Sequence, residues 1–271
     1  MSEPGRGNLQ PFRQRSDLGM GSLLQVKDVK RSFGNLRALD GVTLNVDEKT
    51  VTILIGPNGS GKTTLINVIT GFQKPDEGQI YYGSTEITGW SPQQVYGTGI
   101  ARTFQIPSMF GKLTVLENLL VAEKNHPGES LAKSMVKRLW AKHETDAIEK
   151  ATKILELLGM SEQLTTPASL LSGGQMKLVE IGRALMSDAN LYLLDEPVSG
   201  VNPTLAHEIF ARIIRLREEY GITFFIVEHR LDVALKYVDY VNAMASGKLL
   251  AAGPPQQVIN DPKVIEAYLG A

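Results

Sequence analysis

A glycine-rich octapeptide at residues 56–63, GPNGSGKT, places the strongest constraint on the fold. It follows a run of aliphatic and β-branched residues at 51–55, and residues 65–69 then place apolar side chains on one helical face. Strand, glycine-rich turn and helix in this order are the context of a phosphate-binding loop, or P-loop. We therefore expect this part of the chain to adopt an α/β fold that holds a nucleoside phosphate.

Each residue type in this loop suits phosphate binding. Glycines let backbone N–H groups surround the phosphates, and the N-terminus of the following helix favours their negative charge. We expect Lys62 to neutralise the outer phosphates and the Thr63 hydroxyl to bind Mg²⁺. The alternative is a glycine-rich turn without a ligand. The residues predicted to bind the nucleotide here are Gly56, Pro57, Asn58, Gly59, Ser60, Gly61, Lys62, Thr63 and Thr64.

Two carboxylates, Asp195 and Glu196, follow an apolar run at residues 191–194. At the end of a buried strand, Asp195 can face the Mg²⁺ of the P-loop, and Glu196 is then near the γ-phosphate, where it can accept a proton from water. Acidic residues also follow strands merely to cap the next helix, which is the alternative. A P-loop in the same chain favours metal binding and catalysis.

The pentapeptide LSGGQ at residues 171–175 precedes an amphipathic helical pattern. Taken by itself, it is explained by Ser172 as an ordinary N-cap with glycines in a loop. The functional interpretation is a second anion cradle, made by a hydroxyl and glycine N–H groups at a helix N-terminus. Because one chain needs only one P-loop, a second cradle suggests that two protomers share the nucleotide.

Composition excludes several other classes of protein. The chain has 271 residues, a net charge of −1 and no cysteine, which excludes disulfides, thiol nucleophiles and Cys-ligated metals. Its four histidines are scattered, so a metal held by His is not expected, and the balanced charge argues against nucleic-acid binding. The apolar runs fall far short of the ~20 residues needed to cross a bilayer. Residues 1–21 lack an apolar core, and we interpret them as a disordered tail.

The order of predicted elements indicates an α/β fold with a helical middle. Residues 23–44 have the pattern of short strands and turns, and residues 106–167 that of a helical insert. The insert contains a capping box at Thr114 and Glu117, an apolar run of Leu116, Leu119, Leu120 and Val121, and a helix at 146–158 with Ile148, Ile154, Leu155 and Leu158 on one face. The elements predicted after Ser172 are a helix to about 186, a strand at 191–194, a helix at 203–220, a strand at 222–227, a hairpin at 240–252 and a helix at 262–269. This alternation predicts a mostly parallel sheet covered on both faces.

Five motifs occur in one order: the P-loop, Gln105 in the segment 101–105, LSGGQ, LLDE, and Glu228 with His229. In this order they resemble the ATP-binding cassette (ABC) family over residues 23–252. The resemblance implies ATP and Mg²⁺ as cofactors and a P-loop NTPase core with a mostly parallel sheet, an N-terminal antiparallel β part and a helical subdomain. The implied domain covers 22–271, with a core at 22–105 and 168–252, the helical subdomain at 106–167 and a C-terminal helical tail at 253–271.

The resemblance also implies individual roles. Phe33 would stack on adenine, Gln105 would touch Mg²⁺ and the attacking water, Glu196 would be the general base and His229 would hold the γ-phosphate. The implied metal ligands are Thr63, Gln105 and Asp195. In a head-to-tail dimer burying two ATP, the residues contacting the ATP of the opposite subunit would be Ser172, Gly173, Gly174, Gln175 and Asn202.

Three of these assignments have structural alternatives. Phe33 is also explained as a core aromatic. Gln105 is also explained by local capping or hydrogen bonding, and His229, which follows a buried strand, by a satisfied core histidine.

Finer similarity points to the ATPase subunits of branched-chain amino acid importers. It lies in Phe110 and the segments 101–105, 113–119, 199–203 and 262–270. Asn202 stands where most ABC proteins have Asp, which is similar to this subfamily. Related cassettes for urea or short amides, or for lipopolysaccharide export, share much of the C-terminal pattern. No residue here would select an amino acid, because the ATPase touches none.

The leading hypothesis is a transport motor. ATP binding would close a dimer with a second ABC ATPase subunit, either a copy or a paralogue, and hydrolysis would move membrane permease subunits. This implies a cytoplasmic protein at the inner face of the cell membrane, an extracytoplasmic solute-binding protein reached through the permease, and no nucleic acid. The apolar residues Ile106, Pro107, Met109 and Phe110 suit a docking groove for a permease helix, or ordinary packing under the helical part.

Two other classes of function compete with transport. A soluble ABC protein of DNA repair or translation is disfavoured, because the chain has one cassette with a compact insert and no basic excess. A P-loop kinase acting on a small molecule leaves LSGGQ and His229 unexplained.

Overall fold

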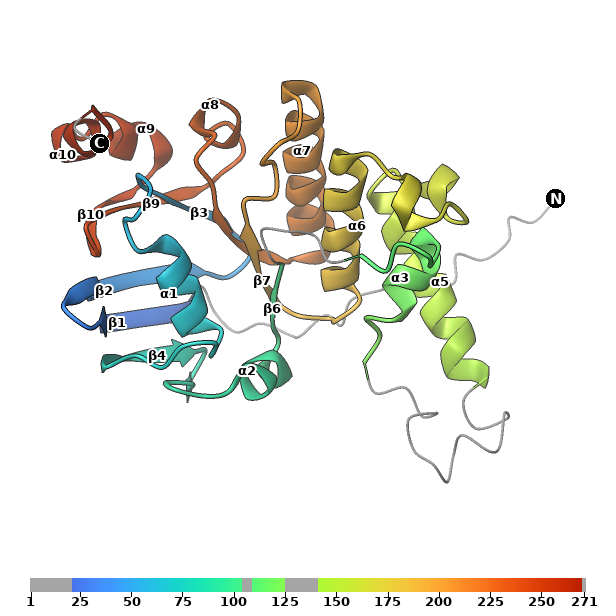
Figure 1. The fold of residues 1–271 in the computed structure, drawn as a ribbon, viewed down its shortest axis with the longest axis horizontal. Coiled ribbons are helices and arrows are strands. Elements are labelled where there is room, and N and C mark those ends of the chain that lie inside the picture. Colours follow the sequence, from blue (N-terminus) through green and yellow to red (C-terminus); the bar gives the residue numbers. More distant parts are fainter. Residues whose placement is uncertain (1–20, 104–108, 125–140, 270–271) are drawn as a thin grey trace.

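The structure, a computed structural model, describes residues 21–103, 109–124 and 141–269. Residues 1–20 of the predicted tail lie outside this part of the chain, as do Gln105, Ile106 and Pro107. Two sheets and the helices around them form the described fold (Figure 1). No helix in the described ranges is long and apolar enough to span a membrane.

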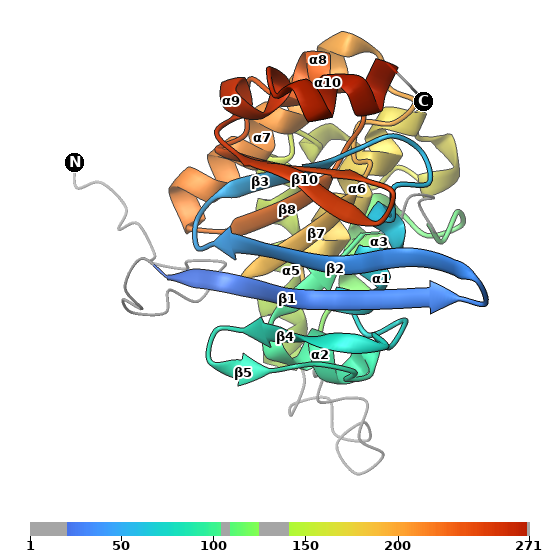
Figure 2. The ribbon, with the colours of Figure 1, turned by 90° about the vertical axis from the view of Figure 1, so that its left-hand side faces the viewer.

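The first sheet is antiparallel, with strand order β2-β1-β4-β5. In the view of Figure 2, its long strands β1 and β2 lie toward the viewer. Its strands are β1 (Ser22–Phe33), β2 (Leu36–Asp47), β4 (Glu77–Tyr82) and β5 (Thr85–Glu86). The expectation of short strands is wrong for β1 and β2, which have 12 residues each. An irregularity between Val26 and Val29, with Asp28 at φ 47°, accommodates the residues that break the alternation of apolar and polar side chains.

The second sheet is mostly parallel, as predicted, with strand order β10-β9-β3-β8-β7-β6. Its strands are β3 (Val51–Ile55), β6 (Ile100–Arg102), β7 (Leu191–Asp195), β8 (Thr223–Val227), β9 (Tyr240–Ala245) and β10 (Lys248–Gly253). Every residue of β3, β7 and β8 is buried, because helices or the other sheet cover both faces. β9 and β10 form the predicted antiparallel hairpin.

Helices fill the space around the second sheet. They are α1 (Lys62–Ile69), α2 (Pro92–Thr98), α3 (Val115–Leu120), α5 (Ala141–Leu157), α6 (Gly173–Leu185), α7 (Pro203–Tyr220), α8 (Leu231–Ala234), α9 (Pro255–Ile259) and α10 (Pro262–Leu269). The predicted capping box is confirmed, because Thr114 and Glu117 form it at α3. At α7 the Asn202 side chain accepts from the Leu205 N–H. Local sequence therefore determines where these helices begin.

Two residues of the apolar patterns predicted in the helical insert lie at the surface. Val121 is 53% exposed and Ile148 is 38% exposed. Val121 follows the last residue of α3, and Ile148 lies at the margin of the buried face of α5, which contains Ala151, Ile154 and Leu155. The other predicted members of that face, Ile154, Leu155 and Leu158, are buried.

Two apolar clusters lie on opposite faces of the second sheet. Along β3, Ile53 and Ile55 belong to one cluster and Leu54 to the other. The α1 side chains join the cluster with Leu54, between the two sheets, whereas α3, α5, α6 and α7 join the cluster with Ile53. The carboxyl ends of β3, β7 and β8 meet at one edge, which is where parallel α/β sheets bind ligands.

Candidate nucleotide site

The P-loop has no room for side chains at two of its glycines. A Cβ at Gly56 would collide with the Met244 carbonyl oxygen of β9. Gly61 lies at φ 101°, and a Cβ there would be 2.5 Å from the Ala38 carbonyl oxygen of β2. The loop is therefore held tightly against both sheets, and only glycine allows this course of the backbone.

The P-loop leads directly into α1, whose N-terminus has no side-chain cap. Gly61 is the N-cap residue and makes no side-chain cap hydrogen bond, and the first turn contains no acidic residue. By contrast, α2, α3, α6 and α7 each begin with a side chain that accepts from a backbone N–H. The first N–H groups of α1 can therefore bind an anion, so the loop fits a phosphate group.

Lys62 lies across the loop that precedes it. Its Nζ donates to the carbonyl oxygens of Gly56 at 2.7 Å and Pro57 at 2.9 Å. Burial lowers the pKa of Lys62, while the charges of Glu196 and Asp195 act in the opposite direction. The amine is thus a partly desolvated cation close to two carboxylates, which an anionic ligand would stabilise further.

Asp195, the last residue of β7, is buried in an ion pair that the motif analysis missed. Its Oδ2 lies 3.1 Å from Nη2 of Arg102, and the two side chains are 6% and 8% exposed. Burial lowers the pKa of Arg102, and Asp195 opposes that shift. Arg102 belongs to segment 101–105, but sequence alone carries no sign that β6 and β7 are neighbours.

Glu196 and His229, which were each expected near the γ-phosphate, lie close together. His229 Nδ1 lies 3.5 Å from Glu196 Oε1, because the parallel neighbours β7 and β8 end side by side. The His229 side chain is 51% exposed, so the core-histidine alternative is wrong. Glu196 has φ 51°, unusual for a residue other than glycine, and its N–H donates to the Val227 carbonyl oxygen at 2.9 Å.

Glu228, beside His229, is a buried carboxylate to which no role was assigned from sequence. It accepts backbone N–H groups of Val198 at 3.0 Å, His229 at 3.1 Å and Arg230 at 3.3 Å. Burial raises the pKa of Glu228, and these hydrogen bonds act in the opposite direction. Glu228 therefore fixes the loop after Glu196 to the segment that carries His229.

The LSGGQ segment forms an N-cap, as its simplest interpretation predicted. The Ser172 N–H donates to Gln175 Oε1 at 2.9 Å, and the Gln175 N–H donates to Ser172 Oγ at 3.3 Å. Gly173 borders open space, whereas a Cβ at Gly174 would collide with Leu205 of α7. Because α6 packs on the face of β7 opposite to α1, the fold keeps the two anion cradles apart (Figure 1).

Comparison with known proteins assigns this chain to a family. The family described as "ABC transporter" matches residues 39–199, which include the P-loop, LSGGQ, Asp195 and Glu196. The chain belongs to the ABC transporter ATP-binding cassettes. This is a family of ATPases, and the cassette is an ATP-binding subunit of an ABC transporter.

Individual relatives are similar over nearly their whole length. One, from Methanocaldococcus jannaschii, is named a probable branched-chain amino acid transport ATP-binding protein LivG; it is 49% identical, with 92% of this chain and 97% of that protein covered. BraF of Pseudomonas aeruginosa, named a high-affinity branched-chain amino acid transport ATP-binding protein, is 36% identical, with 92% and 98% covered. Residues 248–271 also match a family described as "Branched-chain amino acid ATP-binding cassette transporter".

Solved structures agree with the fold. An ATP-binding cassette of an ABC transporter in its ADP conformation has a TM-score of 0.81 and 47% identity, with 93% of this chain and all (100%) of that chain covered. The protein cbiO1 of Clostridium perfringens, described as part of the ABC transporter complex cbiONQ, has a TM-score of 0.76 and 26% identity, with 90% of this chain and 93% of that chain covered.

Four other residues that were predicted to contact ATP or Mg²⁺ differ in where they lie. Phe33 is 43% exposed at the end of β1, so the core alternative is wrong, and the Arg31 guanidinium lies 5.0 Å from its ring centroid. Thr63 is exposed at the start of α1, whereas Asn202 is used as the N-cap of α7. Gln105 lies outside the described residues.

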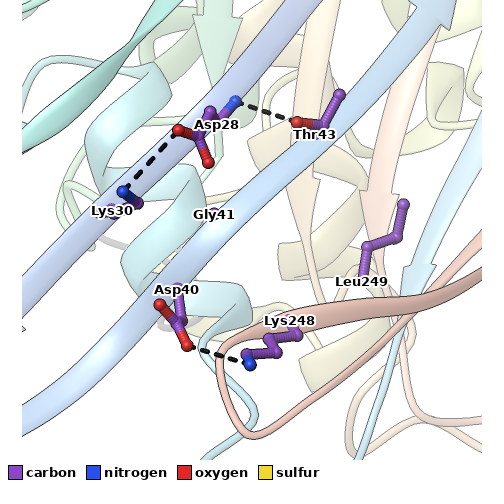
Figure 3. Close-up of a pocket in the computed structure, with 7 residues that line it drawn as sticks. All are labelled: Asp28, Lys30, Asp40, Gly41, Thr43, Lys248 and Leu249. Carbon is purple, nitrogen blue, oxygen red and sulfur yellow. Dashed lines mark hydrogen bonds and ion pairs between the residues drawn. The ribbon is translucent and has the colours of Figure 1, made fainter.

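Two hollows on the described part of the cassette lie outside the P-loop. A groove of about 460 Å³ lies between α1, α2, β6 and α6, and Phe72, Tyr96, Arg102 and Arg183 contribute to its lining. A second, open hollow of about 510 Å³ lies on β1, β2 and β10 (Figure 3).

The open hollow carries charges that neutralise one another. Lys248 lies 3.1 Å from Asp40, and Lys30 lies 3.8 Å from Asp28. Lys248 and Arg37 hold the pKa of Asp40 below its usual value. The hollow contains no residue of the P-loop.

Proposed function

We propose that this cassette hydrolyses ATP at the carboxyl ends of β7 and β8, with Glu196 as the general base. The approach of Glu196 to His229 carries the proposal, since a carboxylate that accepts a proton from water must lie beside the group that holds the γ-phosphate. The left-handed backbone of Glu196 supports it, because such strained residues cluster at active sites.

In this proposal the P-loop binds and orients the nucleotide. The first N–H groups of α1 and the Lys62 ammonium bind the phosphates, and Phe33 stacks on the base. Lys62 exchanges its carbonyl partners in the loop for phosphate oxygens, and this charge-assisted contact is stronger than the neutral ones that it replaces.

Mg²⁺ fits the oxygen atoms available next to the P-loop. Thr63 is exposed at the start of α1, and Asp195 is the last residue of β7. Hydroxyl and carboxylate oxygens are the ligands that Mg²⁺ prefers, and we assign Thr63, Asp195 and Gln105 to it. When bound, the ion neutralises charge on the phosphates.

We propose further that two ATPase subunits, copies or paralogues, share each nucleotide head to tail. The separation of the LSGGQ turn from the P-loop of its own chain supports this, because Ser172, Gly173, Gly174 and Gln175 would otherwise have no anion to bind. Gly173 borders open space, so a ligand or partner can approach the N-terminus of α6 closely. Asn202 would contact the same ATP from its position at the start of α7.

The groove between the two parts of the cassette would receive a helix of a membrane permease. Three aromatic side chains support this: Phe72 is 52%, Tyr96 38% and Phe110 49% exposed. Met109 packs against the core, so part of the segment that ends at Phe110 serves packing and part is available for docking. A permease bound here would hold the cassette at the inner face of the cell membrane and connect it to an extracytoplasmic solute-binding protein.

We assign the transported molecule to the branched-chain amino acids. The names of the relatives and the match of residues 248–271 support this assignment. A direct test is uptake of labelled leucine by cells in which this chain is deleted and then restored. Normal leucine uptake in the deleted strain would contradict the assignment.

The assignment of Glu196 is tested with Glu196→Gln, which keeps the shape of the side chain and removes the proton acceptor. We expect hydrolysis to slow by ~10²–10⁴-fold while ATP affinity stays within about 2-fold. Glu162→Gln, an exposed carboxylate far from the P-loop in sequence, is the matched control and should hydrolyse ATP normally. An unchanged rate in Glu196→Gln would remove Glu196 from the role of base.

The same variant tests the shared site. With Mg-ATP, Glu196→Gln should change from monomer to dimer in light scattering after size exclusion, and adding Lys62→Ala should abolish the change. A monomer that binds ATP would contradict a homodimeric site. Mixing with candidate partner ATPases then tests the heterodimer.

A further inference from the structure

One guanidinium group joins three parts of the cassette that meet at the nucleotide site. Arg102, the last residue of β6, pairs with Asp195 at the end of β7 through Nη2. Its Nη1 donates to Asn67 Oδ1 at 2.6 Å and lies 3.3 Å from Thr70 Oγ1. Asn67 belongs to α1 and Thr70 is its C-cap, so Arg102 ties the P-loop helix to the strand that carries Asp195.

The next residue, Thr103, also holds Asp195 through its side-chain hydroxyl. The Asp195 N–H donates to Thr103 Oγ1 at 3.3 Å, and the Thr103 N–H donates to the Leu193 carbonyl oxygen at 3.0 Å. Residues 102 and 103 thus contact both the main chain and the side chain of Asp195. Because Arg102 binds Oδ2, it restricts the rotation of the carboxylate whose other oxygen, Oδ1, remains for a further partner.

The shape of arginine suits this position. Its planar group presents donors in fixed directions, so one side chain can bind Asp195, Asn67 and Thr70 together. A lysine would supply the same charge as a single flexible ammonium and would lose that combination. Any cation could form the ion pair with Asp195. Holding the carboxylate in one orientation also requires the guanidinium group to be fixed by its contacts with α1.

We propose that Arg102 is a positioning residue that orients Asp195 for Mg²⁺. The inference rests on the proposed function, since it takes Asp195 as a metal ligand. Arg102 touches neither nucleotide nor metal; it acts through Asp195. Groups that orient metal ligands in this way contribute ~10–100-fold to metal affinity in other proteins.

The test uses Arg102→Lys in the full chain, because the positive charge beside the buried Asp195 is kept. Binding of a fluorescent ATP analogue is measured by anisotropy as Mg²⁺ is titrated, and again in EDTA. We expect the Mg²⁺ concentration at half-maximal effect to rise ~10-fold or more. Nucleotide affinity in EDTA should stay within about 2-fold of wild type, because a positioning role acts only through the metal.

Two further variants separate positioning from general damage. Arg183→Lys is the matched control: Arg183 lines the same groove, and its guanidinium lies 5.5 Å from the Phe110 ring centroid. It should leave the Mg²⁺ titration unchanged. Asp195→Asn should weaken the Mg²⁺ dependence, and Arg102→Lys added to it should cause no further shift, because the two residues act as one unit.

The variants distinguish a failure of the metal site from a failure of the role of Arg102. If Asp195→Asn leaves the Mg²⁺ titration unchanged, the proposed metal ligand is wrong and the inference fails with it. If Asp195→Asn shifts the titration but Arg102→Lys does not, the metal site stands and only the role of Arg102 is overturned. A shift from Arg102→Lys that persists in the Asp195→Asn background would also overturn it.

Discussion

Gly174 allows the starts of α6 and α7 to pack together. A Cβ at this position would collide with Cδ2 of Leu205 and would lie 3.2 Å from its Cγ and 3.5 Å from Val201 Cγ1. Leu205 lies in the first turn of α7, three residues after the cap Asn202. Both helix starts carry residues that we assign to the ATP of the opposite subunit, so Gly174→Ala tests the packing that sets their relative position.

The expected energy has two opposing parts. Forcing a methyl group into this contact costs about 1–3 kcal/mol. Alanine favours the helix over glycine by up to about 1 kcal/mol. Gly174→Ala should therefore destabilise the cassette by up to about 2 kcal/mol. In a Leu205→Ala background the obstacle is gone, so the same change should stabilise it by up to about 1 kcal/mol.

The assay is thermal and urea denaturation of the two single variants and the double variant. For a domain of this size, 1 kcal/mol corresponds to a shift in Tm of about 2–4 °C. Gly173→Ala is the matched control, because no atom lies within 4 Å of a Cβ built there. Equal destabilisation by Gly174→Ala in both backgrounds would refute the reasoning, since the cost would then not come from Leu205.

Two further predictions concern charged groups of the site. Lys62→Ala should weaken ATP binding by ~10–100-fold, because a charge-assisted contact of about 1.5–3 kcal/mol is lost. Without nucleotide, the variant should melt at no lower a temperature than wild type. Burial lowers the pKa of Lys62, which means that the folded state disfavours its charged form. Normal ATP affinity, measured by fluorescence titration, would contradict the P-loop assignment. Burial raises the pKa of Glu228 above 4.5, so its contribution to stability is fully present below the unfolded pKa and is lost as pH rises through the folded value. Urea denaturation across pH 4–8 should therefore show wild type losing stability relative to Glu228→Gln as pH rises in that window, and a constant difference would show that Glu228 does not titrate there.

Much of the fold could be predicted because its signals are local. The helices that begin at Ser172 and Asn202 start where a side chain can accept the first free N–H groups, and α7 and α10 have the predicted bounds. The P-loop strand, turn and helix also lie where the glycine pattern placed them. Short elements such as α2 and β6 were missed, because a few residues carry no clear apolar period.

The sequence by itself determined the family, the P-loop and the strand end that carries Glu196, because these signals are local to the motifs. Only the tertiary structure decided which side chains support them. Arg102 reaches Asp195 because β6 lies beside β7 in the sheet, and Glu228 anchors Val198 because β8 lies on the other side of β7. No local pattern encodes such partners, since burying a charge is tolerated only where distant segments supply its hydrogen bonds.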